Sequence, residues 1–376
     1  MDFGFSREQE DIRALAGKLL GDFCKVERLP DFEKAGERMD RELWKALADA
    51  SLLGVALPEE FGGMGFGIAE LCVLLEQAGR FVAPVPLLPA LLLGAAPVAR
   101  FGSDAQKKKW LGDVVAGKVV LTAALAEPDS RDARKPSTRA KADGSGFVLD
   151  GVKTCVPAAR LSARILVPAA TADGRVVVAL VAPDAEGVML EDQAVTTGDV
   201  HHRVTLSGVK VGAEDVLAGA DRGADVLDAM VQHAIAGLCA MELGVAERAL
   251  RMTAKYTSER KQFGKVIATF QAVAQRAADA YIDVEAIRLT TWQAVWRLAE
   301  GLPARRELAI AKFWASEGGH RACYAAQHLH GGIGVDKDYP LHRYYLLSKQ
   351  IELTLGGAQH HLASLGAALA SAEPPT

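Results

Sequence analysis

Two adjacent glycines near the end of the chain stand beside side chains that can bind an anion. The stretch 327–334 reads QHLHGGIG, in which Gly331 and Gly332 follow the imidazoles of His328 and His330. Backbone N–H groups at a glycine turn can hold a phosphate group, and an imidazole can donate a hydrogen bond to it. The same letters also fit a plain turn between two helices. A metal site is not expected, because no third ligand stands near the two histidines.

A basic motif lies upstream of these glycines. Residues 256–265 read YTSERKQFGK and place Arg260 and Lys261 where a long predicted helix ends, with Gly264 as the residue after its C-terminus. Cations in a last helical turn complement the helix dipole, which is a structural role. An arginine fixed at a helix end can also bind a phosphate group through two hydrogen bonds. Both interpretations stay open for this motif alone.

The elements that must position these motifs begin with helices. Residues 1–117 predict an N-terminal helical domain, because Ser6 and Gln9 form a capping-box pattern and apolar residues recur at helical spacing. Four glycines and a proline predict a loop over residues 57–67. A second helix is expected to follow from about Ile68 to Arg80.

The middle of the chain has the pattern of a β-domain. Short β-branched runs over residues 118–218 are separated by the turn signals Asp143-Gly144, Asp150-Gly151 and Asp173-Gly174, which is typical of a small antiparallel barrel or sandwich. Residues 219–376 return to long helices and predict a C-terminal four-helix bundle, so the expected fold is α+β and multidomain. The expected helices cover Ala224–Ser258, Ile267–Glu300, Arg305–His328 and Tyr339–Ala370.

Composition excludes several classes of protein. A net charge of −4 gives no basic footprint, so a nucleic-acid partner is not expected. The 5 cysteines form no CxxC pair, which indicates a reducing, cytoplasmic setting. The uncharged stretch Phe81–Ala99 approaches the length of a membrane span. Four prolines interrupt it, so we expect a buried helical segment with an irregular entry and no membrane association.

The order of the motifs resembles the acyl-CoA dehydrogenase family over essentially the whole chain. The motifs in order are PEEFGGMG from Pro58, AEP from Ala126, GVKT from Gly151, SERKQFGK from Ser258 with Gln271 beyond it, HGGIG from His330, and DYPLHRYY from Asp338. The resemblance implies a tetramer that uses FAD, with an electron-transfer flavoprotein as electron acceptor. In that family the flavin takes a hydride from the acyl β-carbon while a glutamate removes the α-proton.

This chain departs from the family at the catalytic base. Counting from Arg343-Tyr344-Tyr345 places Leu355 where most members have the glutamate. A minority of members carry it about ten residues before a Leu-Gly pair, and Leu243-Gly244 then places Ala234 there. Neither side chain can accept a proton. Glu242 and Glu352 are the nearest substitutes, although each also reads as an ordinary helix carboxylate.

The residues that resemble contacts to a subunit's own flavin have also changed. Cys155 stands where the family's flavin-packing strand has a tryptophan, and Pro157 removes a backbone donor from the same strand. We expect Cys155 to be a small core residue. In contrast, the positions that the resemblance assigns to the distal half of a neighbouring subunit's FAD are retained, with His328 in place of the usual glutamine. They are Arg260, Gln271, His328, Leu329, His330, Gly331 and Gly332.

The resemblance therefore implies a non-catalytic subunit of an α2β2 heterotetramer. A second acyl-CoA dehydrogenase subunit would carry the glutamate and bind the acyl-CoA, and KQIELTLGG with HLHGGIG is most similar to bacterial enzymes acting on steroid side-chain CoA thioesters. One alternative is a self-sufficient homotetramer whose base is Glu242 or Glu352. Another is a flavin-free scaffold or acyl-CoA-binding protein. Arg131, Arg134 and Lys135 either bind CoA or form a solvated loop.

Overall fold

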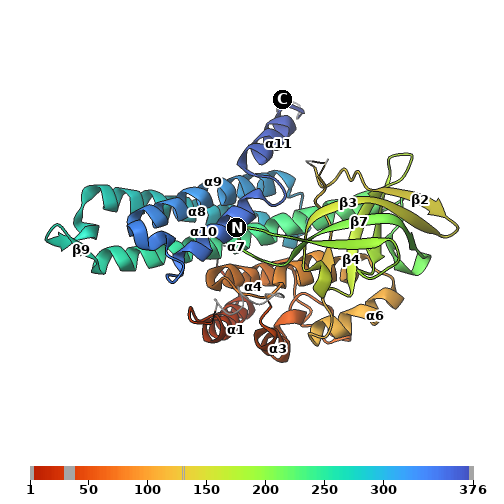
Figure 1. Ribbon diagram of the computed structural model, residues 1–376, viewed down its shortest axis with the longest axis horizontal. Coiled ribbons are helices and arrows are strands. Elements are labelled where there is room, and N and C mark those ends of the chain that lie inside the picture. The colour runs from red at the N-terminus through yellow and green to blue at the C-terminus, as the bar shows by residue number, and fades with distance from the viewer. Residues whose placement is uncertain (1–3, 29–38, 129, 131, 372–376) are drawn as a thin grey trace. The chain divides into compact units, whose positions relative to one another are not determined.

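The computed structural model describes residues 4–28, 39–128, 130 and 132–371 (Figure 1). Its contacts divide the chain into two compact units, which are described separately below. The bundle unit comprises Met1–Val26, Cys72–Ala83 and Ile235–Thr376, and the sheet unit comprises Glu27–Leu71 and Pro84–Ala234. The two units are defined by contacts and each combines separate parts of the chain. The predicted division into three consecutive domains, with boundaries at residues 117 and 218, therefore stays a prediction.

An eight-stranded sheet forms the centre of the sheet unit. Seven strands follow the order β6-β7-β3-β2-β4-β5-β8, and β1 pairs with β4. The expected antiparallel pairing holds except for two parallel contacts, β1 with β4 and a single residue pair of β2 with β4, so the sheet is mixed. The strands are β1 (Leu121–Ala123), β2 (Arg139–Asp143), β3 (Gly146–Pro157), β4 (Arg164–Ala170), β5 (Val176–Val181), β6 (Val188–Gln193), β7 (His201–Val211) and β8 (Val216–Ala218).

The turn signals predicted this sheet with one error. Asp143-Gly144 and Asp173-Gly174 lie at the expected turns between β2 and β3 and between β4 and β5. Asp150-Gly151 lies inside β3, where the register with β7 shifts. A Cβ at Gly151 would lie 2.7 Å from the Thr138 hydroxyl oxygen, so glycine permits a close strand contact there. The predicted turn is therefore wrong, and the pair marks an irregular pairing within one long strand.

A buried ion pair connects separate segments of the sheet unit. Lys153 Nζ lies 2.6 Å from Glu127 Oε1, and both side chains are almost fully buried. Glu127 also accepts from the hydroxyls of Ser137 and Thr138, each at 2.6 Å. Burial raises the pKa of Glu127, but the charge and hydrogen bond of Lys153 together with the two hydroxyls lower it to about 2. The carboxylate thus ties the segment after β1 to β3 and to the residues before β2.

Short helical segments complete the sheet unit. The uncharged stretch that resembled a membrane span forms the π-helical segment η3 and the helix α5, and its residues 90–95 are buried, which confirms a buried helical segment. By length and composition, one helix in the described part of the chain could cross a membrane, namely α7, and 78% of its apolar window is buried. The segments are α3 (Arg41–Asp49), η1 (Leu52–Gly54), η2 (Glu59–Phe61), η3 (Leu88–Ala95), α5 (Ala96–Phe101), α6 (Asp104–Val115), η4 (Ala159–Leu161) and η5 (Ala213–Asp215).

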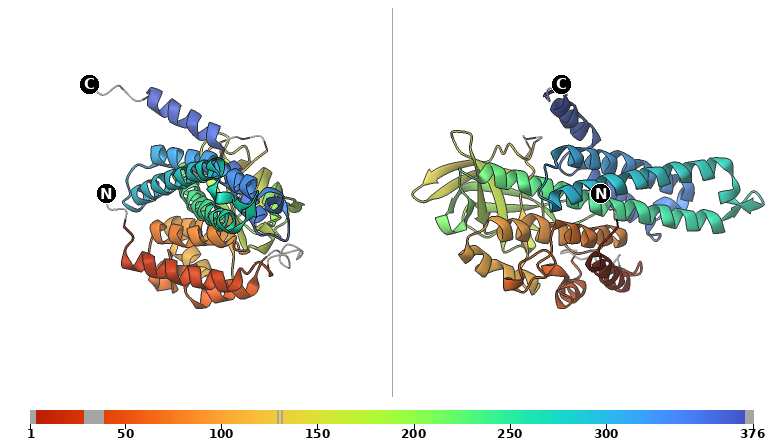
Figure 2. Two further views of the ribbon diagram at one scale, coloured as in Figure 1. Left: turned by 90° about the vertical axis from the view of Figure 1, so that its left-hand side faces the viewer. Right: turned by 180° about the vertical axis from the view of Figure 1, so that it is seen from behind.

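In the bundle unit, α7, α8 and α9 lie side by side, whereas α11 projects away from them (Figures 1 and 2). Leu243 of α7, Ile287 of α8 and Ala322 of α9 share one buried core cluster, which confirms the predicted helical bundle. A Cβ at Gly244 would lie 1.9 Å from the Glu76 carbonyl oxygen, so α4 and α7 touch backbone to backbone. The helices are α1 (Arg7–Phe23), α4 (Ile68–Phe81), α7 (Gly223–Glu259), α8 (Gln271–Ala299), α9 (Arg305–His330), α10 (Leu341–Leu353) and α11 (Ala358–Ser371).

The last predicted helix is wrong as a single element, because it breaks between α10 and α11. Leu355 and Gly356 adopt positive φ values of 57° and 96° in the break. The buried Lys312 donates from Nζ to the carbonyls of Ile351, Glu352 and Gly356 at 2.9, 3.1 and 3.0 Å. Its ammonium group therefore satisfies carbonyls that a continuous helix would have bonded internally.

Removing Lys153 should destabilise the sheet unit strongly. We expect Lys153→Met to lower the free energy of unfolding by about 3–5 kcal/mol, because it leaves the Glu127 carboxylate buried without its cation. Urea unfolding followed by circular dichroism measures the change. Lys45→Met, which removes the exposed Lys45–Asp49 pair, is the matched control and should cost less than about 1 kcal/mol. Equal effects of the two substitutions would contradict this account.

Candidate functional site

Arg260 lies at the junction between a long helix and a small hairpin. Helix α7 ends at Glu259, and β9 (Lys261–Gln262) pairs with β10 (Lys265–Val266). Phe263 and Gly264 connect them with φ values of 54° and 79°, as a two-residue hairpin turn requires. The predicted role of Gly264 as the residue after the helix is therefore wrong. The Arg260 backbone donates to the Tyr256 carbonyl and accepts from Ile267 N–H, both at 2.9 Å, and its side chain is exposed.

The glycine pair forms the turn after α9. Helix α9 ends at His330, and the 3-10 segment η7 (Gly331–Val335) follows. Gly331 has a φ of 65°, which favours glycine, and its N–H donates to the carbonyls of Gln327 and His328. A Cβ added at Gly331 or Gly332 would meet nothing within 4 Å. A ligand group can therefore approach this backbone closely.

Most of the predicted cofactor residues are exposed on the bundle unit. Gln271 is the first residue of α8, and its side chain is exposed like those of Arg260 and His328. Leu329 is half-buried. We call the exposed residues the outward set, and it comprises Arg260, Gln271, His328, Gly331 and Gly332.

His330 differs from the outward set, because its side chain turns into the bundle unit. It is 4% exposed and stacks on Tyr256 with ring centroids 4.4 Å apart. Its Nδ1 lies 2.8 Å from the Ala326 carbonyl and its Nε2 lies 3.1 Å from the Tyr339 hydroxyl. Burial lowers the pKa of His330, which favours the neutral ring. The ring is thus fully engaged by the protein, and the two tyrosines were missed from the sequence, although Tyr256 stands four residues before Arg260.

The two positions at which the resemblance predicts a base carry apolar side chains. Leu355 is half-buried in the break between α10 and α11, and Ala234 is buried within α7. Glu352, the first substitute, pairs with Lys349 at 2.5 Å.

Glu242, the second substitute, is enclosed within the bundle. Its Oε1 accepts from Ser348 Oγ at 2.7 Å, while its Oε2 has no hydrogen-bond partner among the residues that the structure describes. Burial raises the pKa of Glu242 to about 8, against the opposing effects of Ser348 and Lys312. A carboxyl group that is fully buried and protonated at neutral pH is poorly placed to remove a proton from a bound substrate.

The strand that resembles the family's flavin-packing strand has its donors already engaged. Cys155 N–H donates to Gln193 Oε1 at 2.6 Å, and Thr154 N–H donates to the Ala126 carbonyl at 2.9 Å. Pro157 has no N–H to offer. Cys155 has a positive φ of 49° and is exposed, so the expectation of a small core residue is wrong. No sequence pattern pointed to Gln193, which lies on β6.

The basic loop considered for CoA is largely engaged in internal contacts. Arg134 Nε donates to Asp228 Oδ1 at 2.7 Å, and Gln232 donates to the second oxygen of the same carboxylate. Lys135 is exposed, and Arg131 lies outside the described residues. All five cysteines are free. Within the described ranges, the structure places no three His, Cys, Asp or Glu side chains together as a metal site.

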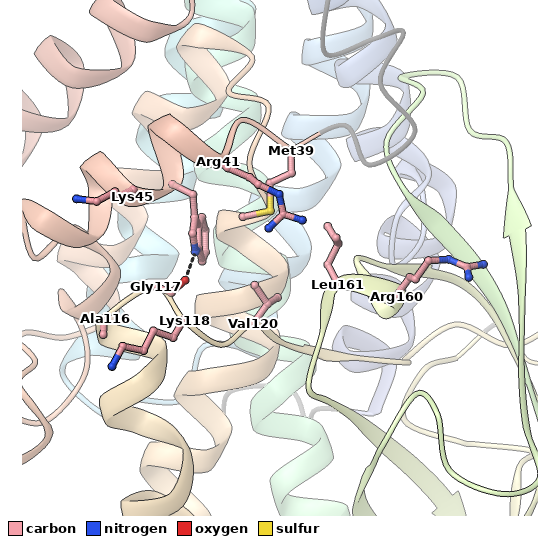
Figure 3. Close-up of a pocket in the computed structure, with 10 residues that line it drawn as sticks. Met39, Arg41, Lys45, Ala116, Gly117, Lys118, Val120, Arg160 and Leu161 are labelled. Atoms are coloured by element: carbon pink, nitrogen blue, oxygen red, sulfur yellow. Dashed lines mark hydrogen bonds between the residues drawn. The ribbon is translucent and has the colours of Figure 1, made fainter.

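A cavity of 390 Å³ lies in the sheet unit. Figure 3 shows Lys45 and Lys118 pointing away from Arg160 at its wall. Arg160 pairs with Asp192 at 2.8 Å, and Lys45 with Asp49 at 2.5 Å, so its cations are partly neutralised. This cavity contains none of the predicted site residues. Its lining is Met39, Arg41, Trp44, Lys45, Ala116, Gly117, Lys118, Val120, Arg160 and Leu161.

Comparison with known families and proteins matches most of the chain. The description "Acyl-CoA dehydrogenase, N-terminal domain" matches residues 6–118, and "Acyl-CoA dehydrogenase, C-terminal domain" matches residues 221–370. Acyl-CoA dehydrogenase FadE27 of Mycobacterium tuberculosis is 40% identical over 379 residues, which cover 98% of this chain and 99% of that protein.

Two solved structures are also closely similar to this chain. The ChsE4–ChsE5 complex from Mycobacterium tuberculosis matches with a TM-score of 0.94 and 39% identity over 100% of both chains. A variant of the Tcur3481–Tcur3483 steroid ACAD, or acyl-CoA dehydrogenase, matches with a TM-score of 0.91 and 42% identity over 96% of this chain and 98% of that one. Both names describe pairs of different chains.

The raised pKa of Glu242 makes a prediction about stability and pH. The Glu242 carboxyl keeps its proton in the folded state up to about pH 8, whereas in the unfolded state it loses the proton above its ordinary pKa of 4.5. The contribution of Glu242 to the free energy of unfolding therefore declines as the pH rises from about 4.5 to about 8. Glu242→Gln keeps an acceptor for Ser348 and cannot ionise, so its stability relative to the parent protein should rise across that window. Melting temperatures at pH 5 and pH 8 measure this. The exposed Glu300→Gln is the control, and a Glu242→Gln difference that is independent of pH would contradict the prediction.

Proposed function

The chain belongs to the acyl-CoA dehydrogenase family, and we propose that it is the non-catalytic subunit of a heteromeric, FAD-dependent enzyme of that family. Members of the family are FAD-dependent flavoproteins, and two closely similar structures are named as pairs of two chains. In this proposal a partner acyl-CoA dehydrogenase subunit supplies the catalytic glutamate and binds the acyl-CoA. This chain holds the distal half of the partner's FAD.

The observation that carries the proposal is the contrast between two sets of hydrogen-bond donors. The outward set is exposed, its arginine is held at a helix end, and the Gly331–Gly332 backbone is open to a ligand. In the part of the chain that the structure describes, the Arg260 guanidinium has no ion-pair partner. A guanidinium can bind a pyrophosphate through two hydrogen bonds, and the missing side chains of Gly331 and Gly332 leave room for a ligand at the turn. These residues fit the distal half of FAD.

The contacts to a flavin of this chain's own fit less well. Gln193 occupies the Cys155 N–H, and Pro157 offers no donor. A flavin ring placed there would have to displace Gln193 and would still lack a donor at Pro157. The chain therefore fits a subunit that contributes to one half of a shared FAD site and not to the other half.

The residues of this chain bind and orient and do not transfer protons in this proposal. FAD, when bound, accepts the hydride removed from the acyl chain. Arg260 would neutralise charge on the pyrophosphate, and Gln271 and His328 would offer polar contacts to the same half of the cofactor. The self-sufficient alternative needs Glu242 or Glu352 as base. The burial of Glu242 and the Lys349 ion pair of Glu352 argue against it.

The substrate class and the electron acceptor are proposed by similarity. One similar structure is named a steroid ACAD, and this supports a steroid side-chain CoA thioester as the substrate of the complete α2β2 enzyme. An electron-transfer flavoprotein as acceptor and a cytoplasmic location follow from the family resemblance and the cysteine content. The flavin-free scaffold is disfavoured by the outward set, which such a scaffold does not need.

Expression of the chain with and without its partner tests the proposal. The partner to be used is a second acyl-CoA dehydrogenase subunit that carries the catalytic glutamate. We expect this chain alone to purify without stoichiometric FAD and without dehydrogenase activity, and the co-purified complex to carry both. Flavin absorbance per polypeptide and reduction of an artificial electron acceptor measure the two properties. A lone chain that is yellow and turns over acyl-CoA would contradict the proposal.

Arg260→Ala should weaken FAD binding in the complex. A hydrogen bond to a charged group contributes about 1.5–3 kcal/mol, so the FAD dissociation constant should rise by about 10- to 100-fold. Fluorescence of released flavin after dilution measures it. Arg251→Ala, on the same helix and paired with Glu247, is the matched control and should leave FAD affinity unchanged. An unchanged FAD dissociation constant in Arg260→Ala would contradict the assignment of Arg260 to the FAD site.

A further inference from the structure

We propose that His330 is a positioning residue that holds the Gly331–Gly332 turn in a fixed position relative to Arg260. In this way it controls how tightly the shared FAD is bound. The inference rests on the proposed function and deepens it. His330 does not touch the cofactor in this account, because its ring is buried. It acts through two tyrosines from different segments of the bundle unit.

The first link joins the two phosphate-binding segments. The His330 ring stacks on the Tyr256 ring with centroids 4.4 Å apart and an interplanar angle of 18°. Tyr256 is on the last turn of α7, and its carbonyl accepts from the Arg260 N–H at 2.9 Å. His330 is the residue directly before Gly331. One stacked pair thus connects the backbone that fixes Arg260 with the backbone that begins the glycine turn.

The second link fixes the orientation of the ring. Nδ1 lies 2.8 Å from the Ala326 carbonyl, which can only accept, so Nδ1 carries the proton in the neutral ring. Nε2 then accepts from the Tyr339 hydroxyl at 3.1 Å. Tyr339 belongs to the segment that leads from η7 to α10, and its ring centroid lies 5.3 Å from that of His330. Both ends of the glycine turn are therefore tied to the same imidazole.

The turn itself folds back onto α9 beside His330. Gln327 Nε2 donates to the Gly334 carbonyl at 3.3 Å. A Cβ at Gly334 would lie 2.9 Å from the Gln327 carbonyl oxygen and 3.2 Å from His330 Cβ, so the turn has little room to move inward. The path of Gly331 and Gly332 therefore depends on where α9 and the His330 ring stand relative to the end of α7.

A graded series of variants in the intact complex tests the role of His330. Tyr339→Phe removes only the hydroxyl, His330→Phe keeps a stacking ring without its hydrogen bonds, and His330→Leu removes both. The rate of FAD release, followed by flavin fluorescence after dilution, should rise about 3-fold, about 5-fold and more than about 10-fold in that order. Ile287→Val, in the buried core of the same unit, controls for lost stability. It should lower the melting temperature without changing the rate.

The outcomes separate this inference from the proposed function. If the His330 and Tyr339 variants lower the melting temperature like Ile287→Val but release FAD at the parent rate, His330 is a core residue only and the inference is overturned. If Arg260→Ala also leaves FAD binding unchanged, the proposed function fails as well. Should His330→Leu not assemble, His330→Phe and Tyr339→Phe still decide the question, because both preserve an aromatic ring at the altered position.

Discussion

A hydrogen-bond donor that is already used inside a protein cannot serve a ligand without breaking its existing bond. This constraint distinguishes the two parts of the proposed flavin site. Gln193 accepts from the Cys155 N–H in the sheet unit, whereas the Arg260 side chain is exposed in the bundle unit and a Cβ added at Gly331 or Gly332 would meet nothing within 4 Å. Breaking the hydrogen bond to Gln193 costs its net energy before any ligand contact is gained.

Much of the architecture could be predicted from the sequence, because its signals are local. The capping box of Ser6 and Gln9 is present at α1, and the predicted helix from Ile68 to Arg80 matches α4 within one residue. Strong helical periodicity over long segments likewise predicted α7, α8 and α9. These features depend on residues within a few positions of one another.

The errors arise where a distant residue decides the local structure. Lys312 stabilises the break at Leu355 from another helix. Gly356 and Gly357 beside it are a local helix-breaking signal that the prediction of a single helix overlooked. Asp150-Gly151 reads as a turn until Thr138 of a neighbouring segment is placed against it. The outward positions of the candidate site came from the family resemblance. The inward orientation of the His330 ring could not be predicted from that resemblance, because it depends on contacts with Tyr256 and Tyr339.

The break between α10 and α11 has a consequence for the subunit arrangement proposed above. Leu355 is a non-glycine residue with a φ of 57°, a conformation that costs free energy and persists only when its surroundings enforce it. The hydrogen bonds from Lys312 to the surrounding carbonyls hold the backbone in this conformation. In the proposed heteromer, in which Leu355 stands at the position of the base, this backbone frame is maintained at an energetic cost although its side chain is chemically inert. Two related subunits can in this way specialise by exchanging single side chains, while a common backbone keeps them able to assemble with each other.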